Sequence, residues 1–538
     1  MSDMMGSALS ALVSYQRALA TTSHNIANAN TEGYSRQRVE LGTRVANQTG
    51  AGSIGSGVEV TGIRRSYDQF AVEQVRSNTS GLAREQTFAG LAAQVETVVS
   101  DPVTGVNASF SRFFNAVQDV ATDPSSLSAR RVMLSEGGAL TDRFRAIDTQ
   151  LGQLDNDVNA RLRSSVDEIN GFAVRIADLN KAIADASGAM GGGMPNDLLD
   201  ARDQALLGLN QLVKVSTVSQ SDGSLNVFIG NGQSLVLSGS PQKLAIGSNS
   251  FEPGRPEITL ADGGVITDFI SGGSLGGLLA FRKEVLTPMR NQVGLMAYAV
   301  ASEINTVQTG GRDLSGNAGQ PFFSMPPVSV QTSGLNTGSA SVTASITALS
   351  GLTGDNYRVV ADGSGGFSLY TQPGGTAVNP ADVGLGITIS AGASAGDSFL
   401  IRPVADVAAG LRVNLTAPGQ IAAAGASGSF GVGDNSNALR MGAVEDGAVL
   451  FGGKVSIADG VKNMISELAS TVRSSEIGEQ AQKTLLEQAV SRQESVSGVN
   501  LDEEAANLMK YQQAYQAAAQ VASTANTIFQ TMIDAFRR

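Results

Sequence analysis

The chain has 538 residues, which is too long for one hydrophobic core and predicts three or four folded units of roughly 100 to 200 residues each. Its 37 Lys and Arg against 49 Asp and Glu give a net charge of -12, which argues against nucleic acid as a partner. With no cysteine and a single histidine, His24, disulfides are excluded, and catalytic triads and Cys-His metal cages nearly so. We expect no metal and no cofactor.

The first thirty residues lack the basic segment and apolar block of a secretory signal peptide. No window reaches the about 18 uninterrupted apolar residues that would span a membrane. The sequence therefore predicts neither a cleaved signal peptide nor a membrane span. Composition alone would suggest a cytoplasmic protein.

Both ends of the chain are predicted to be helices with a coiled-coil contact line, called here the predicted seam. Side chains recur in steps of four and three residues at each end, and at the C-terminal end the pattern continues over five heptads. The seam is part apolar and part polar. Its N-terminal residues are Met5, Leu9, Leu12, Gln16, Leu19, Ser23, Ile26 and Asn30, and its C-terminal residues include Leu501, Ala505, Leu508, Gln512, Tyr515, Ala519, Ala522, Asn526, Phe529 and Ile533.

The two terminal helices also share local sequence, SYQRAL at 14–19 and KYQQAY at 510–515, so Gln16 and Gln512 occupy equivalent positions. A buried polar residue at such a position costs stability but fixes register and partner. Asn500 is placed to cap the C-terminal helix, which would extend roughly 55 Å at 1.5 Å per residue. One small domain cannot bury a seam of this length. We therefore expect the ends to pair with each other or with neighbouring subunits.

The first helix runs into a polar stretch, SHNIANANTEGY at 23–34. Asn28 and Asn30 add amide donors and acceptors, and Gly33 permits a left-handed turn before Tyr34. A plain helix stop would need only the glycine, so we interpret the stretch as a helix end embedded among other polar groups. The candidate assembly interface comprises Leu9, Leu12, Gln16, Leu19, Ile26, Asn28, Asn30, Gly33, Tyr34, Leu508, Gln512, Tyr515, Ala519, Ala522 and Phe529.

The middle of the chain is helical, then mainly β, then helical again. A very long apolar row is predicted to end at GAMGGG (188–193), and Asp222-Gly223, Asn231-Gly232 and Asp362-Gly363 are predicted hairpin turns. This nesting predicts an elongated, multidomain α+β protein in which the N- and C-terminal helices pair beside a long-helix bundle, with two mainly-β domains inserted at its far end. The predicted divisions are a terminal coiled-coil region (1–60 and 490–538), a long-helix bundle (61–213, 274–318 and 432–489), a first β domain (214–273) and a second, outer β domain (319–431).

No motif indicates a catalytic site. GAVLFGGKV (447–455) has Ala448 where a phosphate loop needs its first glycine, and its lysine precedes valine. Glu503 and Glu504 lie in the first turn of a helix, where the helix dipole accounts for them. His24 has no second ligand candidate nearby, so we expect it to make a hydrogen bond at an interface.

The terminal sequences carry a family resemblance. SHNIANANTEGY with the upstream ALVSYQRAL resembles the N-terminal signature of bacterial flagellar axial proteins, and the segment VSGVNLDEEAANLMKYQQAYQAAAQVASTANTIFQTMID looks like their C-terminal counterpart. Three segments are most similar to the proteins at the junction between hook and filament. They are Tyr34 with the following SRQRV, the segment SGVNLDEE, and the segment MPNDLLDARDQALLGLNQLV (194–213). The resemblance covers most of the chain apart from about 320–430.

The resemblance implies a structural role without enzymatic activity. Terminal helices of many copies would form a helical layer, with the hook protein on one side and a second hook-filament junction protein on the other. It also implies an extracellular place in the flagellum, export by the flagellar type III apparatus without a cleaved signal peptide, and an export chaperone that binds the C-terminal helix. Nucleic acid and membrane are not expected partners.

Two alternatives stay open at this point. The hook protein or the second junction protein of the same axis would share both ends of the chain but not the segments YSRQ (34–37) and NDLLDARD (196–203). A peptidoglycan hydrolase on an axial scaffold would need a cleft with two acids of separated pKa, and the β segments offer no such spacing.

Overall fold

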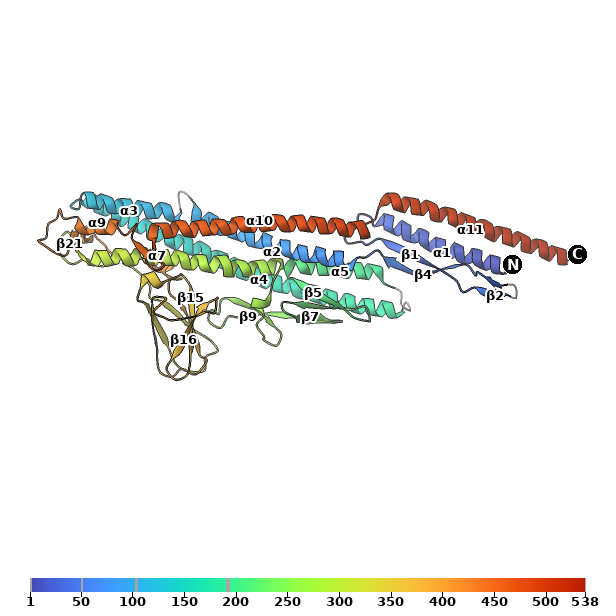
Figure 1. Cartoon of the computed structure of the whole chain (residues 1–538), viewed down its shortest axis with the longest axis horizontal. Coiled ribbons are helices and arrows are strands. Elements are labelled where there is room, and N and C mark those ends of the chain that lie inside the picture. Colours follow the sequence, from blue (N-terminus) through green and yellow to red (C-terminus); the bar gives the residue numbers. More distant parts are fainter. Residues whose placement is uncertain (1, 50–51, 102–104, 190–193, 538) are drawn as a thin grey trace.

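The computed structural model describes residues 2–49, 52–101, 105–189 and 194–537, which form an elongated molecule with both termini at the same end (Figure 1). Most of its length is a bundle of long helices that lie side by side along one axis. These helices are α2 (Gln69–Ser100), α3 (Val106–Thr122), α4 (Leu127–Ala189), α5 (Asn196–Leu212), α6 (Gly273–Phe281), α7 (Thr287–Thr309), α9 (Ser436–Gly442) and α10 (Ile457–Ser497), with a π-helical segment, η2 (Arg282–Leu286), between α6 and α7.

The core of the bundle follows the predicted apolar rows. Along α4 the side chains at helical spacing are fully buried, and they include Leu140, Phe144, Ile147, Leu151, Val158 and Leu162. A cluster of aromatic rings, with centroids 4.7 to 5.8 Å apart, joins α3 to strand β12 (Phe323–Ser324) through Phe113, Phe114, Phe322 and Phe323. α4 continues to Ala189, and residues 190–193 of the predicted stop lie outside the described residues.

A second part of the molecule, the terminal unit, is built from both ends of the chain. It contains α1 (Ser2–Ala27), α11 (Leu501–Phe536) and an antiparallel ribbon of β1 (Gln37–Thr43) and β4 (Val58–Arg65), with a short hairpin, β2 (Asn47–Thr49) and β3 (Gly52–Ile54), beyond it. α1 lies between α11 and the ribbon (Figure 1). The pairing of the terminal helices confirms the predicted fold class, whereas the ribbon of β1 and β4 was not predicted.

The first β module follows α5 and rests on α4. An antiparallel sheet has the order β5-β6-β7-β8, and a separate hairpin pairs β9 with β10. Asp222-Gly223 connects β5 to β6, and Asn231-Gly232 connects β6 to β7, as predicted. The strands are β5 (Val215–Ser219), β6 (Leu225–Ile229), β7 (Gln233–Leu237), β8 (Ser240–Pro241), β9 (Leu244–Ser248) and β10 (Pro256–Leu260), followed by the 3-10 turn η1 (Thr267–Phe269).

The second β module contains a sheet of order β13-β19-β15-β16-β17 and a separate pair, β14 and β18. Asp362-Gly363 lies in the turn between β15 and β16, which confirms the predicted hairpin. The strands are β13 (Ser329–Thr332), β14 (Val342–Ile346), β15 (Asn356–Ala361), β16 (Phe367–Gln372), β17 (Ala377–Val378), β18 (Leu385–Ile389) and β19 (Ser398–Arg402), with the 3-10 turn η3 (Leu349–Gly351) before β15.

Short elements connect the second β module to the bundle. They are β11 (Gly311–Arg312) paired with β21 (Ala424–Gly425), β12 paired with β20 (Arg412–Val413), β22 (Ala448–Leu450) paired with β23 (Val455–Ser456), the short helix α8 (Val407–Gly410) and the 3-10 turn η4 (Pro418–Gln420).

The β modules are not at the far end of the bundle, and that prediction was wrong. Figure 1 shows both projecting from one side of it, while α3, α9 and β21 occupy the end opposite the termini. Polar side chains of α4 hold the first module along the helix. Asn180 Nδ2 donates to the carbonyls of Leu225 (2.8 Å) and Ser238 (2.6 Å), and Asn170 exchanges hydrogen bonds with the backbone of Leu244.

We expect Asn180→Ala to release the first β module from α4. The side chain is fully buried and also accepts hydrogen bonds from Leu225 N and Arg202 Nη1, so its loss leaves several buried groups without partners. Because each such group costs about 1 to 3 kcal/mol, the local stability should fall by about 3 kcal/mol or more. Hydrogen exchange in β6 and β7 measures this, with exposed Asn156→Ala as the control. Unchanged exchange would contradict the anchoring role.

Candidate functional site: the terminal helix pair and its joint

The terminal helices contact each other along a line of mostly small residues. On α11 this line places one residue every seven, at Glu504, Tyr511, Ala518 and Ala525, and the two alanines and the glutamate are buried. On α1 the line includes Ala8, Tyr15, Ala18, Thr22 and Asn25. The rings of Tyr15 and Tyr511, with centroids 6.4 Å apart, pack across the pair. Small side chains let the two helices approach closely and leave little apolar area between them.

The line lies one residue before the predicted seam on both helices. Seam residues therefore flank the contact: Leu9 is 61% exposed and Phe529 is 52% exposed. Gln16 and Gln512 are exposed, so the expectation that a buried glutamine fixes the register is not met within one chain. The tyrosines that precede those glutamines in SYQRAL and KYQQAY are the residues in contact. Of the other seam candidates, Leu12, Leu19, Ile26, Leu508, Ala519 and Ala522 are half-buried, and Tyr515 is exposed.

Large apolar side chains on the two helices face outward. Such a concentration on two neighbouring helices exceeds the scattered exposed apolar residues of an ordinary surface, and it indicates a contact surface for protein. We call this set the exposed apolar surface. It comprises Met4, Met5, Leu9 and Val13 on α1, and Leu501, Met509, Tyr515, Val521, Ile528, Phe529, Met532 and Ile533 on α11.

The asparagine-rich stretch forms the turn between α1 and β1. Asn25 is buried; its Nδ2 donates to Gln37 O and Glu504 Oε2, both at 2.9 Å, and its Oδ1 accepts from the Tyr34 hydroxyl at 2.8 Å. His24 Nδ1 lies 3.0 Å from the same hydroxyl, in agreement with a hydrogen-bonding histidine. Gly33 has a φ of 79°, the left-handed turn that was predicted.

The other two asparagines play smaller parts in this turn. α1 ends at Ala27, so Asn28 and Asn30 follow the helix. Asn28 Nδ2 donates to His24 O at 3.0 Å, which covers a carbonyl at the helix end. Asn30 is exposed. Of the three, Asn25 is therefore the one that binds the two ends of the chain together.

A charged contact fixes the start of α11 against this turn. Arg36 pairs with Glu504 Oε1 and Glu503 Oε2, each at 2.7 Å, and Glu504 is only 2% exposed. The Arg36 backbone N–H also donates to Ser497 O at the end of α10. The helix dipole alone therefore does not account for Glu503 and Glu504. They connect segments 467 and 468 residues apart in the chain.

A second charged cluster, called here the joint, connects the terminal unit to the bundle. Arg65 at the end of β4 contacts Asp200 Oδ1 (2.9 Å) and Asp203 Oδ2 (2.5 Å) of α5, and Arg76 of α2 also pairs with Asp203. The backbone N–H of Ser35 donates to Asp200 Oδ2 at 3.0 Å. All five residues are largely removed from solvent, so the joint holds the terminal unit in a defined position on the bundle.

Burial changes the titration of several groups here. Burial, together with the nearby carboxylates, raises the pKa of Tyr34, so its hydroxyl stays protonated and can donate to Asn25. Burial also raises the pKa of Asp200, although hydrogen bonds from Ser35 and Arg65 act in the opposite direction. Near the joint, burial lowers the pKa of Arg202 to about 10, which leaves this side chain charged at neutral pH.

Within the described residues, no group of three or more His, Asp or Glu side chains is arranged to hold a metal ion. In the same part of the chain, no helix has the length and apolar character needed to cross a membrane.

The sequence prediction missed both charged contacts. One signal was present: Asp197, Asp200 and Asp203, at spacings of three, lie on one face of α5, where cationic side chains can pair with them. Their partners belong to other segments, and Gln37 Nε2 adds a contact to Asp197 at 3.0 Å. The segment MPNDLLDARD therefore supplies the two carboxylates of the joint, those of Asp200 and Asp203.

Comparison with known proteins first defines the class. A family model described as flagella basal body rod protein matches residues 5–34, and one described as flagellar basal body rod FlgEFG protein C-terminal matches 492–535. The first segment lies in the terminal unit, and the second runs from the end of α10 along α11. The fold and its paired ends are thus those of a flagellar axial protein. A third model, the flagellar hook-associated protein FlgK helical domain, matches residues 92–323.

Full-length relatives identify the particular family. Flagellar hook-associated protein 1 of Salmonella typhimurium is 32% identical over 552 residues, covering 99% of this chain and 100% of that protein. The Escherichia coli protein of the same name is 31% identical over 550 residues, with the same coverage, and that of Bacillus subtilis is 26% identical over 560 residues, covering 97% and 96%. The chain therefore belongs to the flagellar hook-associated protein 1 family. It is a structural, non-enzymatic protein of the hook-filament junction.

The fold agrees with a solved structure. The flagellar hook junction protein FlgK from Burkholderia pseudomallei superposes with a TM-score of 0.71 at 23% identity, covering 79% of this chain and 100% of that chain.

We expect Arg36→Met to loosen α11 from the rest of the terminal unit. Removing one partner leaves the Glu504 carboxylate buried without its countercharge, so the free energy of opening of α11 should fall by about 3 to 5 kcal/mol. Hydrogen exchange of α11 peptides measures this. The control is Arg44→Met, because the Arg44–Glu59 pair is exposed and should contribute about 1 kcal/mol or less. Equal effects of the two substitutions would contradict the role given to Arg36.

Proposed function

We propose that copies of this chain assemble through the exposed apolar surface of the terminal unit into a helical layer of the flagellum. The proposal rests on one observation: in most helix pairs the large apolar side chains lie between the helices, and here they do not. Small residues lie between α1 and α11, while Leu9, Tyr515 and Phe529 face outward. The pair is thus folded as one element with its larger apolar side chains left for contacts outside the chain.

The energetic argument supports contact between copies. Burying one large apolar side chain contributes about 1.5 to 3 kcal/mol, so several together can exceed the about 4 to 15 kcal/mol that association costs in lost freedom. The weak apolar contact within the pair also means that the helices gain order when neighbours cover them. Repeated contact of unlike surfaces that does not close gives a helical array.

We propose the hook protein and the second hook-filament junction protein as the partners on the two sides of the layer. Family membership and the implied place in the flagellar axis support this assignment. A junction layer needs two different axial surfaces. If each surface binds a different partner more tightly than it binds another copy of this chain, the layer stops growing after a limited number of copies.

We also propose export by the flagellar type III apparatus to the outside of the cell, with a chaperone on the C-terminal helix before export. The family resemblance supports this route. Figure 1 adds that α11 extends past the N-terminus of α1. In these last turns Ile528, Phe529 and Met532 are exposed apolar side chains that a helper protein can cover in the free chain.

Combining Tyr515→Asp with Phe529→Asp should abolish incorporation into flagella, because each change places a charge on the proposed contact. Both positions are exposed in the single chain, so the bundle and its thermal unfolding should be unaffected. The measurement is the amount of the chain in isolated flagella from a strain that lacks its own copy. Half-buried Leu508 is left unchanged to preserve the helix pair.

The matched control combines Gln513→Asp with Gln520→Asp, which adds the same two charges at exposed positions of α11 away from the predicted seam. It should allow normal incorporation. Normal incorporation of the Tyr515 and Phe529 variant would refute the proposed surface, and equal loss in both variants would show that added charge alone, at any position, disrupts assembly.

A further inference from the structure

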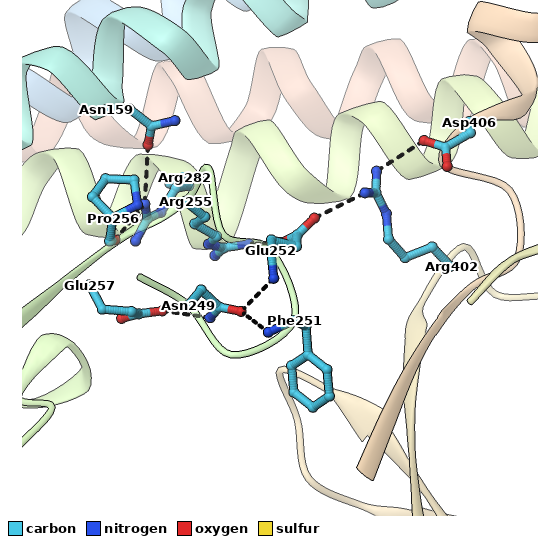
Figure 2. Close-up of polar contacts among 10 residues, drawn as sticks. All are labelled: Asn159, Asn249, Phe251, Glu252, Arg255, Pro256, Glu257, Arg282, Arg402 and Asp406. Carbon is cyan, nitrogen blue, oxygen red and sulfur yellow. Dashed lines mark hydrogen bonds and ion pairs between the residues drawn. The ribbon is translucent and has the colours of Figure 1, made fainter. Parts of the chain in front are cut away.

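A chain of polar contacts runs from the bundle through the first β module to the second (Figure 2). Its central element is the loop 249–255 between β9 and β10. Asn249 Oδ1 accepts from the backbone N–H groups of Phe251 (2.9 Å) and Glu252 (3.1 Å), and Asn249 Nδ2 donates to Glu257 Oε1 (2.7 Å). The loop is therefore held in one conformation, with the Glu252 carboxylate directed at Arg402.

The base of this loop is attached to the bundle. Arg282 of η2 is 3% exposed, and its Nη1 lies 3.4 Å from both Pro256 O and Asn159 Oδ1 of α4. Burial lowers the pKa of Arg282 to about 10, so the guanidinium remains charged at neutral pH. The first β module thus has a fixed point on the bundle beside the loop.

The second β module meets the loop through Arg402, the last residue of β19. Arg402 Nη1 donates to Glu252 Oε1 at 2.9 Å, and Nη2 donates to Asp406 Oδ1 at 3.2 Å. The Arg402 side chain is 14% exposed, so solvent screens this pair less than a surface pair. Next to it, the Gly334 N–H of the second module donates to Ser250 O at 2.7 Å.

We propose that Arg402 acts as a clamp that locks the second β module onto the first and so fixes the direction of both modules relative to the bundle. Two chain segments, 325–328 and 403–406, lead into and out of the second module, and a pair of such connections is a hinge unless cross-contacts restrain it. Arg402 lies at the exit segment and reaches across to the other module. Its pair with Glu252 therefore acts where rotation would begin.

Other contacts could restrain the module in place of the clamp. One is the Gly334 N–H to Ser250 O hydrogen bond described above, and in another the Gly452 N–H, beside β22, donates to Ser350 O of the second module at 2.7 Å. If these contacts fixed the module without Arg402, loss of Arg402 would not change its orientation. The two accounts therefore predict different results for the same variant.

The test measures the distance between the second β module and α4 by pulsed electron spin resonance. The chain has no cysteine, so Gln150→Cys on α4 and Ser368→Cys on β16, both exposed, provide two labelling sites in the full-length protein. The starting protein should give one narrow distance distribution. Arg402→Gln and Glu252→Gln should each shift or broaden it, and the double variant should broaden it no further than either change alone.

The control is Arg412→Gln, which removes the same charge from an exposed position on β20 and should leave the distribution narrow. Glu252→Gln leaves every residue of the second module in place, so its result stands even if Arg402→Gln disturbs the folding of that module. An unchanged distribution in Glu252→Gln would overturn the clamp, as would broadening in Arg412→Gln equal to that in the other variants.

Discussion

The structure depends on the pairing of two helices from opposite ends of the chain through small side chains. Ala18 on α1 and Ala518 and Ala525 on α11 permit close approach, while the rings of Tyr15 and Tyr511 pack across the pair. Because small residues contribute little apolar burial, the pair needs the Asn25, Arg36 and Glu504 contacts at its base to hold it. The larger apolar residues are then free to face other molecules. A pair built on large residues would be more stable alone and would have less surface to offer to assembly.

Polar contacts at a few points give the rest of the molecule a defined shape. The joint between Arg65 and the Asp200 and Asp203 carboxylates connects the terminal unit to the bundle, and Asn180 connects the first β module to α4. Such contacts suit a protein that must present several surfaces in fixed relation to one another. A fully apolar contact would tolerate sliding more readily, whereas directional hydrogen bonds and ion pairs favour one arrangement.

Much of the fold could be predicted from the sequence because apolar periodicity depends on local geometry. The long row of α4 and the Asp-Gly and Asn-Gly hairpins were predicted correctly for this reason. The predicted line of contact between the terminal helices is one residue away from the observed line. Large residues such as Leu9 and Phe529 dominate the apolar pattern of the sequence, whereas the residues buried between the helices are small. The ribbon of β1 and β4 was missed, since none of the residues in its two strands is fully buried.

The charged contacts could not be paired from the sequence, because Arg36 and Glu504 are brought together only by the closed fold.

The central claim, that the exposed apolar surface is covered when copies assemble, is tested most directly by the reactivity of a single thiol. Tyr515→Cys introduces one into a chain without cysteine, and its rate of reaction with a maleimide can be compared between the purified single chain and isolated flagella. The account predicts fast reaction in the single chain and strong protection in flagella. Equal rates in the two states would contradict it.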